Sequence, residues 1–323
     1  MFTHKDIQNR SLFVINGTEH QYLKVVLGQL VLKDSQTDTV ITKIPFPKIL
    51  GLLVIGHTTV TTALIEHCNK HAVPLVVMKP NFRPVFYFGN MAEANYLLRK
   101  KQYQSPKTIL HIAKVLIRDK INNQHQLLLK TREKNENVEK SKSILENSLV
   151  QIEKVLDYKE LMGIEGKAAE AFFQSYFACF DWKQRLPRVK PDPLNATLDI
   201  GYTMLFNYLE CMTRLFGFDP YVGVYHQCWF RRKSLVCDLV EPFRCIIDHQ
   251  IRKSLNYGTF KPADFEIKNH AYILKRGMSK VYTKTFFEAI IQYKVDIFKY
   301  IQQYYRAFMG DKDETQYPRF IYQ

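Results

Sequence analysis

The first 90 residues alternate between short apolar runs and polar connecting segments. Runs of this length, rich in β-branched and aliphatic side chains, are typical of β-strands. One helix is predicted among them over residues 58–71, because Val60, Leu64 and Cys68 recur every four positions. The predicted strands cover residues 11–15, 22–32, 39–44, 51–55, 74–78 and 84–88.

Beyond residue 90 the hydrophobic positions follow the three-to-four-residue spacing of helices. Long helices are predicted over residues 194–216, 234–255 and 283–308, and a segment with three prolines, 182–193, must interrupt the helical pattern. The sequence therefore predicts an α+β fold with two domains. A small N-terminal β-rich domain with one helix, residues 1–90, precedes a larger all-α catalytic domain, residues 91–323.

The composition is that of a globular protein, with 46% hydrophobic and 24% charged residues. No apolar run approaches the ~20 residues of a membrane span, and the polar start of the chain has no signal-peptide core. The six cysteines form no C-x-x-C pair, which is typical of free thiols in a reducing compartment. We expect a cytoplasmic protein that does not enter a membrane.

The net charge of +15, from 46 Lys and Arg against 31 Asp and Glu, is typical of surfaces that bind nucleic acid, an anionic membrane or an acidic protein. The excess is spread along the whole chain, which favours a folded surface that follows a long polyanion over a basic tail. Clusters in the helical half could neutralise phosphates, although each is also typical of a solvated face. They comprise Lys183, Arg185, Arg188 and Lys190; Arg231, Arg232 and Lys233; and Lys275, Arg276, Lys280 and Lys284.

Two carboxylates, Asp238 and Glu241, stand three residues apart in a strongly apolar segment and share one face of a predicted helix. Hard divalent cations bind through one or two carboxylates, with water and phosphate as further ligands. The alternative is a helix salt bridge with Arg244, which the spacing alone favours. His226, twelve residues before Asp238, adds an imidazole that suits Mn²⁺ or Mg²⁺, although a lone histidine is more often a packed residue.

A third acid, Glu165, lies between Gly163 and Gly166 where a helix is predicted to begin. Glycines permit a close backbone approach, as at a ligand site. Alternatively, Glu165 complements the positive end of the helix dipole. The residues alone leave both interpretations open.

Four segments in this order resemble the CRISPR-associated endonuclease/integrase family, the catalytic subunit of spacer acquisition. Residues 22–30, 49–56 and 73–77 of the β-rich part extend the resemblance along nearly the whole chain. One such motif would be weak, whereas four in family order after a matching β domain are specific. The segments are Gly163-Ile-Glu165-Gly, Arg188-Val-Lys-Pro-Asp-Pro-Leu-Asn195-Ala-Thr-Leu, Gly223-Val-Tyr-His226 and Arg232-Lys-Ser-Leu-Val-Cys-Asp238-Leu-Val-Glu241-Pro-Phe-Arg244.

The resemblance implies a DNA endonuclease and integrase that depends on Mg²⁺ or Mn²⁺. Glu165, His226 and Glu241 fall on the three metal ligands of the family, with Asp238 as a supporting catalytic acid. The resemblance also implies that Asn195 and Tyr202 line the site, and that Arg188, Arg232 and Arg244 hold phosphates or the acidic residues. In the implied reaction, the 3′-hydroxyl of a prespacer attacks a phosphodiester of the CRISPR repeat.

The resemblance further implies the partners. They are a prespacer DNA duplex, the CRISPR leader and repeat, a second copy bound through the N-terminal domain, and a small ferredoxin-like companion subunit that bridges two dimers. Two alternatives remain open. One is a branched-DNA repair nuclease without array integration, which would use the same site. The other is a catalytically silent DNA-binding scaffold, against which the intact Glu165, His226 and Glu241 argue.

Overall fold

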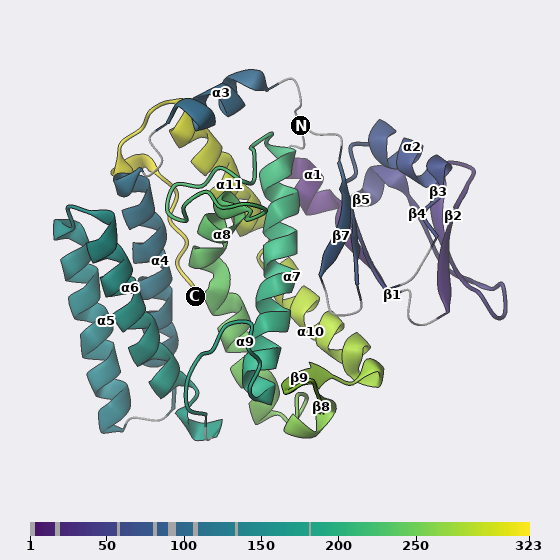
Figure 1. The fold of residues 1–323 in the computed structure, drawn as a ribbon. Helices are drawn as coiled ribbons and strands as arrows, with labels where there is room; N and C mark the ends of the chain where they lie inside the picture. Colours follow the sequence, from purple (N-terminus) through teal and green to yellow (C-terminus); the bar gives the residue numbers. More distant parts are fainter. Residues whose placement is uncertain are drawn as a thin grey trace.

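The computed structural model describes residues 4–16, 20–56, 59–79, 83–89, 95–105, 109–132, 135–180 and 182–323. Its N-terminal part is rich in strands and stands beside a larger helical part (Figure 1). The elements of the N-terminal part are α1 (His4–Asn9), β1 (Ser11–Asn16), β2 (Gln21–Val26), β3 (Gln29–Asp34), β4 (Val40–Pro45), β5 (Ile49–Ile55), α2 (Thr62–Lys70), β6 (Leu75–Met78) and β7 (Pro84–Phe88).

The N-terminal strands form two sheets. One has the order β1-β5-β6-β7, with β1, β5 and β6 parallel and β7 antiparallel to β6. Parallel neighbours require a crossover connection, and α2 provides it between β5 and β6. The other sheet is the antiparallel meander β2-β3-β4. The helix α2 begins after Thr61, whose hydroxyl accepts a hydrogen bond from the Leu64 N–H at 3.3 Å.

Every residue of β5 is buried, because the strand serves two hydrophobic cores. Leu52 and Val54 pack in the core between the two sheets and α2. Leu53 and Ile55 belong to the large core of the helical part. Alternate side chains of a strand point to opposite faces, so β5 joins the β-rich part to the helices.

The described helical part contains helices and the β8–β9 hairpin. In Figure 1, α4, α5 and α6 lie side by side at one edge, and α7, α8 and α9 occupy the middle. The elements are α3 (Tyr96–Gln104), α4 (Leu110–Leu129), α5 (Glu136–Lys154), α6 (Tyr158–Tyr176), α7 (Pro193–Leu215), α8 (Ser234–Val240), α9 (Arg244–Asn256), β8 (Phe265–Lys268), β9 (Ala271–Leu274), α10 (Ser279–Gln292) and α11 (Lys294–Met309).

The structure confirms the β-rich region followed by a helical one, and it refines several elements. The helix predicted over 194–216 is confirmed as α7. The helix predicted over 234–255 is divided into α8 and α9 by a 3₁₀ turn, Glu241–Phe243, which contains Pro242. The hairpin β8–β9 and the short α1 were not predicted, so the helical part is not purely α.

The expected domain junction at residue 90 lies outside the described residues, and the boundaries 1–90 and 91–323 remain predictions. In the part of the chain that the structure describes, no helix is both long and apolar enough to span a membrane.

Candidate active site

The candidate site forms where α4 and α6 meet the turn that follows α8. Lys120 lies on α4, Glu165 on α6 and Glu241 at the start of the 3₁₀ turn. His226 comes from the loop between α7 and α8. The packing of α4 against the 3₁₀ turn brings these segments together although they are far apart in the sequence.

The Lys120 ammonium bridges the two glutamates. Its Nζ lies 2.7 Å from Glu241 Oε2 and also pairs with Glu165 Oε1. The second oxygen of Glu165 accepts a hydrogen bond from the Tyr225 hydroxyl, and Arg244 Nε lies 3.0 Å from Glu241 Oε2. The Glu241 side chain is only 2% exposed. Two carboxylates that would otherwise repel each other are therefore held together by a cation between them.

These cations outweigh the effect of burial on both acids. Burial alone would raise the pKa of Glu241, yet the Arg244 and Lys120 cations lower it to about 2. Burial also opposes the ionisation of Glu165, and the Lys120 cation again lowers the pKa of this group. Both carboxylates are therefore ionised at neutral pH, with Lys120 and Arg244 as their counterions.

Asp238 fixes the backbone and the ring of His226. Its Oδ1 lies 2.7 Å from His226 Nδ1 and accepts the His226 N–H at 2.8 Å. Its Oδ2 accepts the N–H groups of Val224 at 2.6 Å and Tyr225 at 3.1 Å. Asp238 is fully buried, so its carboxylate positions the histidine and does not face a substrate. With Nδ1 engaged, Nε2 is the ring nitrogen left to bind a ligand.

The donor chemistry of this site fits a hard divalent cation. Two ionised carboxylates and an imidazole with a fixed Nδ1 are the ligand types that Mg²⁺ and Mn²⁺ take. Within the described ranges, however, no three His, Cys, Asp or Glu side chains are close enough to one another to hold a metal ion. Lys120 lies between Glu165 and Glu241 instead. That Glu165, His226 and Glu241 converge on one ion remains a prediction.

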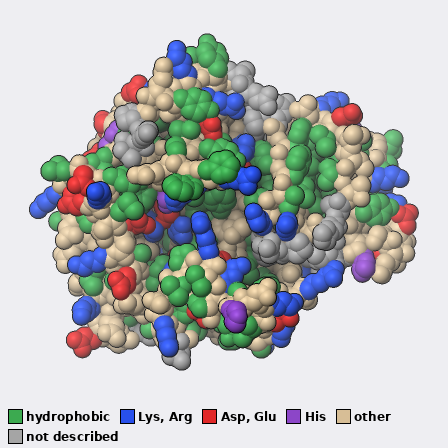
Figure 2. Space-filling model, viewed as in Figure 1, with side chains coloured by type: hydrophobic (Ala, Val, Ile, Leu, Met, Phe, Trp, Pro, Cys, Tyr) green, Lys and Arg blue, Asp and Glu red, His purple; other side chains and the backbone are tan. Residues whose placement is uncertain are grey.

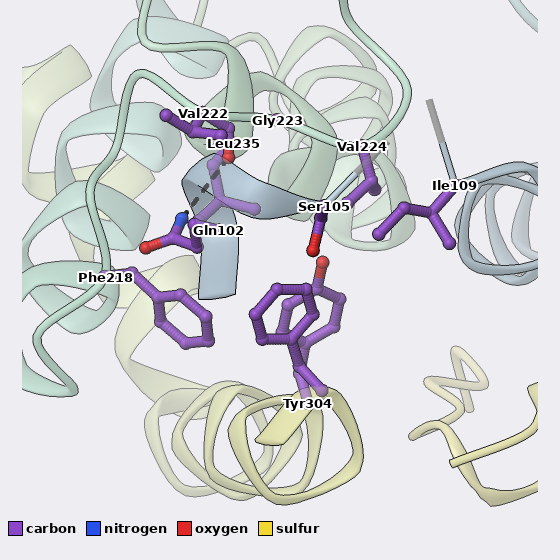
Figure 3. Close-up of a pocket in the computed structure, with 10 residues that line it drawn as sticks. Gln102, Ser105, Ile109, Phe218, Val222, Gly223, Val224, Leu235 and Tyr304 are labelled. Atoms are coloured by element: carbon purple, nitrogen blue, oxygen red, sulfur yellow. Dashed lines mark hydrogen bonds between the residues drawn. The ribbon is translucent and has the colours of Figure 1, made fainter. Parts of the chain in front are cut away.

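The helix α3 holds the loop that carries His226 through hydrogen bonds of Gln102 (Figure 3). Gln102 Nε2 donates to the carbonyls of Asp219 at 3.1 Å and Val222 at 3.4 Å, and its Oε1 accepts the Asp219 N–H at 2.9 Å. A cavity of about 10 Å³ beside these bonds has room for no more than one water molecule. The loop is therefore packed on its inner side, and its free side faces the site.

Tyr202 and Asn195, both on α7, have different surroundings. The Arg244 guanidinium lies 4.6 Å from the centre of the Tyr202 ring, and the Tyr202 hydroxyl donates to the buried Asp248. Tyr202 is thus connected to Glu241 through Arg244. Asn195 is fully buried, and its Oδ1 accepts from Arg185 Nη1 at 2.9 Å and from a backbone N–H of the proline-rich segment. It organises that segment, and the site-lining role implied for it remains a prediction.

The basic residues predicted to bind DNA differ in their ion pairing and in their exposure. Arg185 pairs with Asp199, and Lys233 Nζ lies 2.7 Å from the buried Glu210. Arg244 pairs with Glu241, as described above. In contrast, the side chains of three of these residues are exposed: Lys183, Arg188 and Arg231. Lys190 and Arg232 are half-buried. Contact with DNA remains a prediction for all of these positions.

One of the two initial interpretations of the Glu165 segment is wrong. The helix α6 begins at Tyr158, so Glu165 lies beyond the first turn, where the dipole acts. A Cβ added at Gly163 or Gly166 would meet no atom within 4 Å, so neither glycine is needed for packing among the described residues, and a close approach of a ligand there remains a prediction. Lys120 was missed, because α4 carries polar residues throughout and only the structure shows that Lys120 is among the buried ones.

This chain is similar in sequence to known proteins of one family. Residues 14–288 match the sequence model described as "CRISPR associated protein Cas1". A curated relative, CRISPR-associated endonuclease Cas1 1 of Thermodesulfovibrio yellowstonii, is 28% identical over 285 residues, which is 84% of this chain and 89% of the relative.

Two solved structures share the fold. A Cas6-RT-Cas1–Cas2 complex aligns with a TM-score of 0.80 and 21% identity over 98% of this chain, which spans 36% of the length of that one. A casposase bound to integration product aligns with a TM-score of 0.76 and 19% identity, covering 96% of this chain and 94% of that one.

A two-sheet β region followed by a helical domain is therefore the fold that this chain shares with both structures. Because the sequence model covers most of the chain, the protein belongs to the Cas1 family of CRISPR-associated endonucleases and integrases. This confirms the family resemblance noted from the sequence.

Proposed function

We propose that the protein is a divalent-metal-dependent DNA endonuclease and integrase of CRISPR adaptation, which inserts prespacer DNA into the CRISPR array. The observation that carries the proposal is that Glu165 and Glu241 both pair with the Lys120 ammonium. Beside them lies His226, which Asp238 fixes. Membership of the Cas1 family supports the nuclease and integrase activity.

In this proposal Glu165, His226 and Glu241 hold Mg²⁺ or Mn²⁺. The bound cation would neutralise charge on the scissile phosphate and align the attacking oxygen. Asp238 keeps the His226 ring in one orientation, and the half-buried Arg244 helps to keep Glu241 ionised. A divalent cation held by these carboxylates would replace the Lys120 ammonium, which would then be available to a phosphate oxygen.

The reaction exchanges one phosphodiester for another. The 3′-hydroxyl of the prespacer forms a new P–O bond as the P–O bond to the departing 3′ oxygen of the repeat strand breaks. The attacking hydroxyl loses its proton and the departing oxygen gains one, so no external energy source is needed. With water as the attacking group, the same steps are hydrolysis, which accounts for an endonuclease activity at one site.

The partners follow from the family and from the surface. We propose DNA as substrate, a homodimer through the N-terminal part, and a small companion subunit related to the Cas2 named in the matched complex. On the edge strand β4, Val40 and Ile41 are 45% and 48% exposed, and Leu27 in the β2–β3 turn is 98% exposed. Exposed apolar side chains on a sheet edge favour pairing with another chain.

The substitution Glu241→Ala tests the proposed function. On a supercoiled plasmid that carries a repeat, with Mn²⁺, it should abolish strand transfer and nicking, because the cation is no longer held. Affinity for DNA by fluorescence anisotropy should stay equal or rise slightly, because a negative charge beside the phosphate is lost. The control Glu288→Ala removes the same charge from an exposed position of α10. Integration by Glu241→Ala at the wild-type rate would contradict the metal assignment.

A further inference from the structure

The buried Asn123 of α4 connects the 3₁₀ turn after α8 to a segment near the end of the chain. Its Nδ2 donates to the Pro242 carbonyl and to the Phe320 carbonyl, both at 2.9 Å. Its Oδ1 accepts the Tyr322 N–H at 2.8 Å. Both amide hydrogens and the carbonyl oxygen of this side chain are therefore engaged, and all three partners are backbone groups.

The amide of Asn123 suits this junction better than other side chains of similar size. Aspartate has no N–H to donate, and an apolar side chain would leave three backbone groups without this partner. Burial of an amide costs free energy unless its hydrogen bonds are made, and here they are made to two segments at once. Asn123 therefore fixes the turn and the segment relative to α4.

The segment, residues 317–322, is held along α4 by its backbone, and we call it the strap. Buried and exposed side chains alternate along its second half, as in an extended chain. Asp119, one helical turn before Asn123, accepts the Phe320 N–H at 2.9 Å and pairs with Arg319. The helix α4 thus binds the backbone of the strap at two successive turns.

The strap also contacts the 3₁₀ turn directly. The ring centres of Phe320 and Phe243 are 4.5 Å apart, and Phe243 is the last residue of the turn. On the far side, the Tyr322 hydroxyl lies 2.7 Å from His249 Nδ1 of α9. The turn is therefore held at two points, by the hydrogen bond to the Pro242 carbonyl and by the ring of Phe320.

The first residue of this turn is Glu241, one of the two acids of the candidate site. Pro242 follows it directly, so a shift of the Pro242 carbonyl moves the Glu241 side chain as well. Lys120, which pairs with Glu241 at 2.7 Å, lies on the same stretch of α4 as Asn123. Glu241 keeps its place beside Glu165 only while the turn keeps its position on α4.

The strap lies at the molecular surface. Figure 1 shows the end of the chain beside α4 and α8, and Figure 2, in the same view, shows Lys and Arg side chains around the middle of this face. Ile321 is 58% exposed, whereas its neighbour Phe320 is buried. These adjacent residues provide a matched pair, one that contacts the turn and one that faces water.

We propose that Asn123 is a positioning residue for Glu241, and that it acts together with the strap to set the affinity of the site for a divalent cation. The proposal rests on the proposed function and deepens it, because it adds two supports to the set Glu165, His226 and Glu241. Asn123 acts through the turn and not as a ligand. Loss of contacts that orient metal ligands lowers metal affinity by about ten- to a hundredfold in other proteins.

The test measures Mn²⁺ binding without DNA, by electron paramagnetic resonance, in the wild type and in four variants. Asn123→Leu keeps the size of the side chain and removes its hydrogen bonds, and Phe320→Leu removes the ring that contacts the turn. Ile321→Ala is the matched control on the strap. Ser141→Ala is the control for a buried hydrogen bond elsewhere, because Ser141 Oγ lies 2.7 Å from Ser175 Oγ between α5 and α6.

Asn123→Leu should bind Mn²⁺ at least about tenfold more weakly than the wild type, and Phe320→Leu should lose affinity by a smaller factor. Nicking of a supercoiled plasmid should then need a correspondingly higher Mn²⁺ concentration for half its maximal rate. Ile321→Ala and Ser141→Ala should bind Mn²⁺ as the wild type does. A purely structural role of Asn123 would lower stability without this change in affinity.

Thermal unfolding in EDTA shows which variants are folded at the assay temperature. Wild-type Mn²⁺ affinity in Asn123→Leu would overturn the proposal, and if that variant does not fold, wild-type affinity in Phe320→Leu would do so. An equal loss of affinity in Ser141→Ala would also overturn it, because the effect would then follow from stability alone.

Failure of this inference is distinguishable from failure of the proposed function. A wild type that binds Mn²⁺ and nicks DNA, with an Asn123→Leu variant that does both equally well, refutes only the inference. A wild type that neither binds Mn²⁺ nor nicks DNA in its presence refutes the function and the inference with it.

Discussion

Asp238 contacts His226 twice through one oxygen, at the ring Nδ1 (2.7 Å) and at the backbone N–H (2.8 Å). The carboxylate therefore fixes both the position of the residue on the loop and the rotation of its imidazole. A histidine with Nδ1 bonded in this way presents Nε2 in a defined direction, as metal-binding histidines in proteins usually do.

Asp238→Asn should lower the affinity for Mn²⁺ and the rate of nicking by about ten- to a hundredfold, as the loss of such supporting contacts does elsewhere. The amide keeps the size of the side chain but has one acceptor oxygen for the bonds that two oxygens now accept. Mn²⁺ binding is measured by electron paramagnetic resonance, together with thermal unfolding. Normal Mn²⁺ affinity in a folded variant would show that Asp238 has no part in positioning the histidine.

Gly223→Ala should displace the His226 loop. A Cβ at this position would lie 2.6 Å from Asp238 Oδ2 and 2.8 Å from the Ser234 carbonyl carbon, which is closer than real contacts allow. We expect a loss of about 1–3 kcal/mol in the free energy of unfolding by urea, with reduced nicking. Gly163→Ala is the control, since its Cβ meets open space and removes a glycine from a helix. It should stabilise the protein by about 0.5–1 kcal/mol, and similar effects of both changes would contradict the structure.

Lys120→Met should destabilise the metal-free protein and increase the thermal stabilisation that added metal gives. Without the ammonium, Glu165 and Glu241 repel each other in a buried site, and breaking such a pair costs about 3–5 kcal/mol. Added Mn²⁺ should therefore raise the melting temperature more in this variant than in the wild type. Lys284→Met breaks an exposed pair with Glu288 and should change little. An unchanged metal-free melting temperature would show that Lys120 is not the counterion of the site.

The buried Asp248 makes stability depend on pH. Burial raises its pKa to about 7, although the Tyr202 hydroxyl and the Arg244 cation act in the opposite direction. The folded protein thus binds a proton more tightly than the unfolded chain, so this contribution is present below pH 4 and is lost as pH rises towards 7. Asp248→Asn should flatten the decrease in the free energy of unfolding between pH 5 and pH 8 by about 2.7 kcal/mol, which is about 1.36 kcal/mol for each of the two pH units between 5 and the pKa. Urea titrations at both pH values measure it, and parallel curves would refute the assignment.

The sequence predicted those parts of the fold and site that depend on local patterns. The helix α7 follows from an uninterrupted apolar spacing, and the motif around Asp238 and Glu241 led to the family. The break at Pro242 was missed because apolar residues on both sides continue the helical period. Lys120 could not be assigned a role, because its partners are 45 and 121 positions away and only the packing of α4 against α6 and the 3₁₀ turn brings them together.

The two-sided burial of β5 has a consequence for how the molecule responds to damage. Removing the β-rich part would strip Leu53 and Ile55 from the helical core, and removing the helices would expose these same two side chains to water. The two parts should therefore melt in a single cooperative transition, and a protease cut near residue 90 should release no stable fragment. For the same reason, a force that pulls on the β2-β3-β4 sheet is transmitted through the sheet that contains β5 to the helices that carry the site.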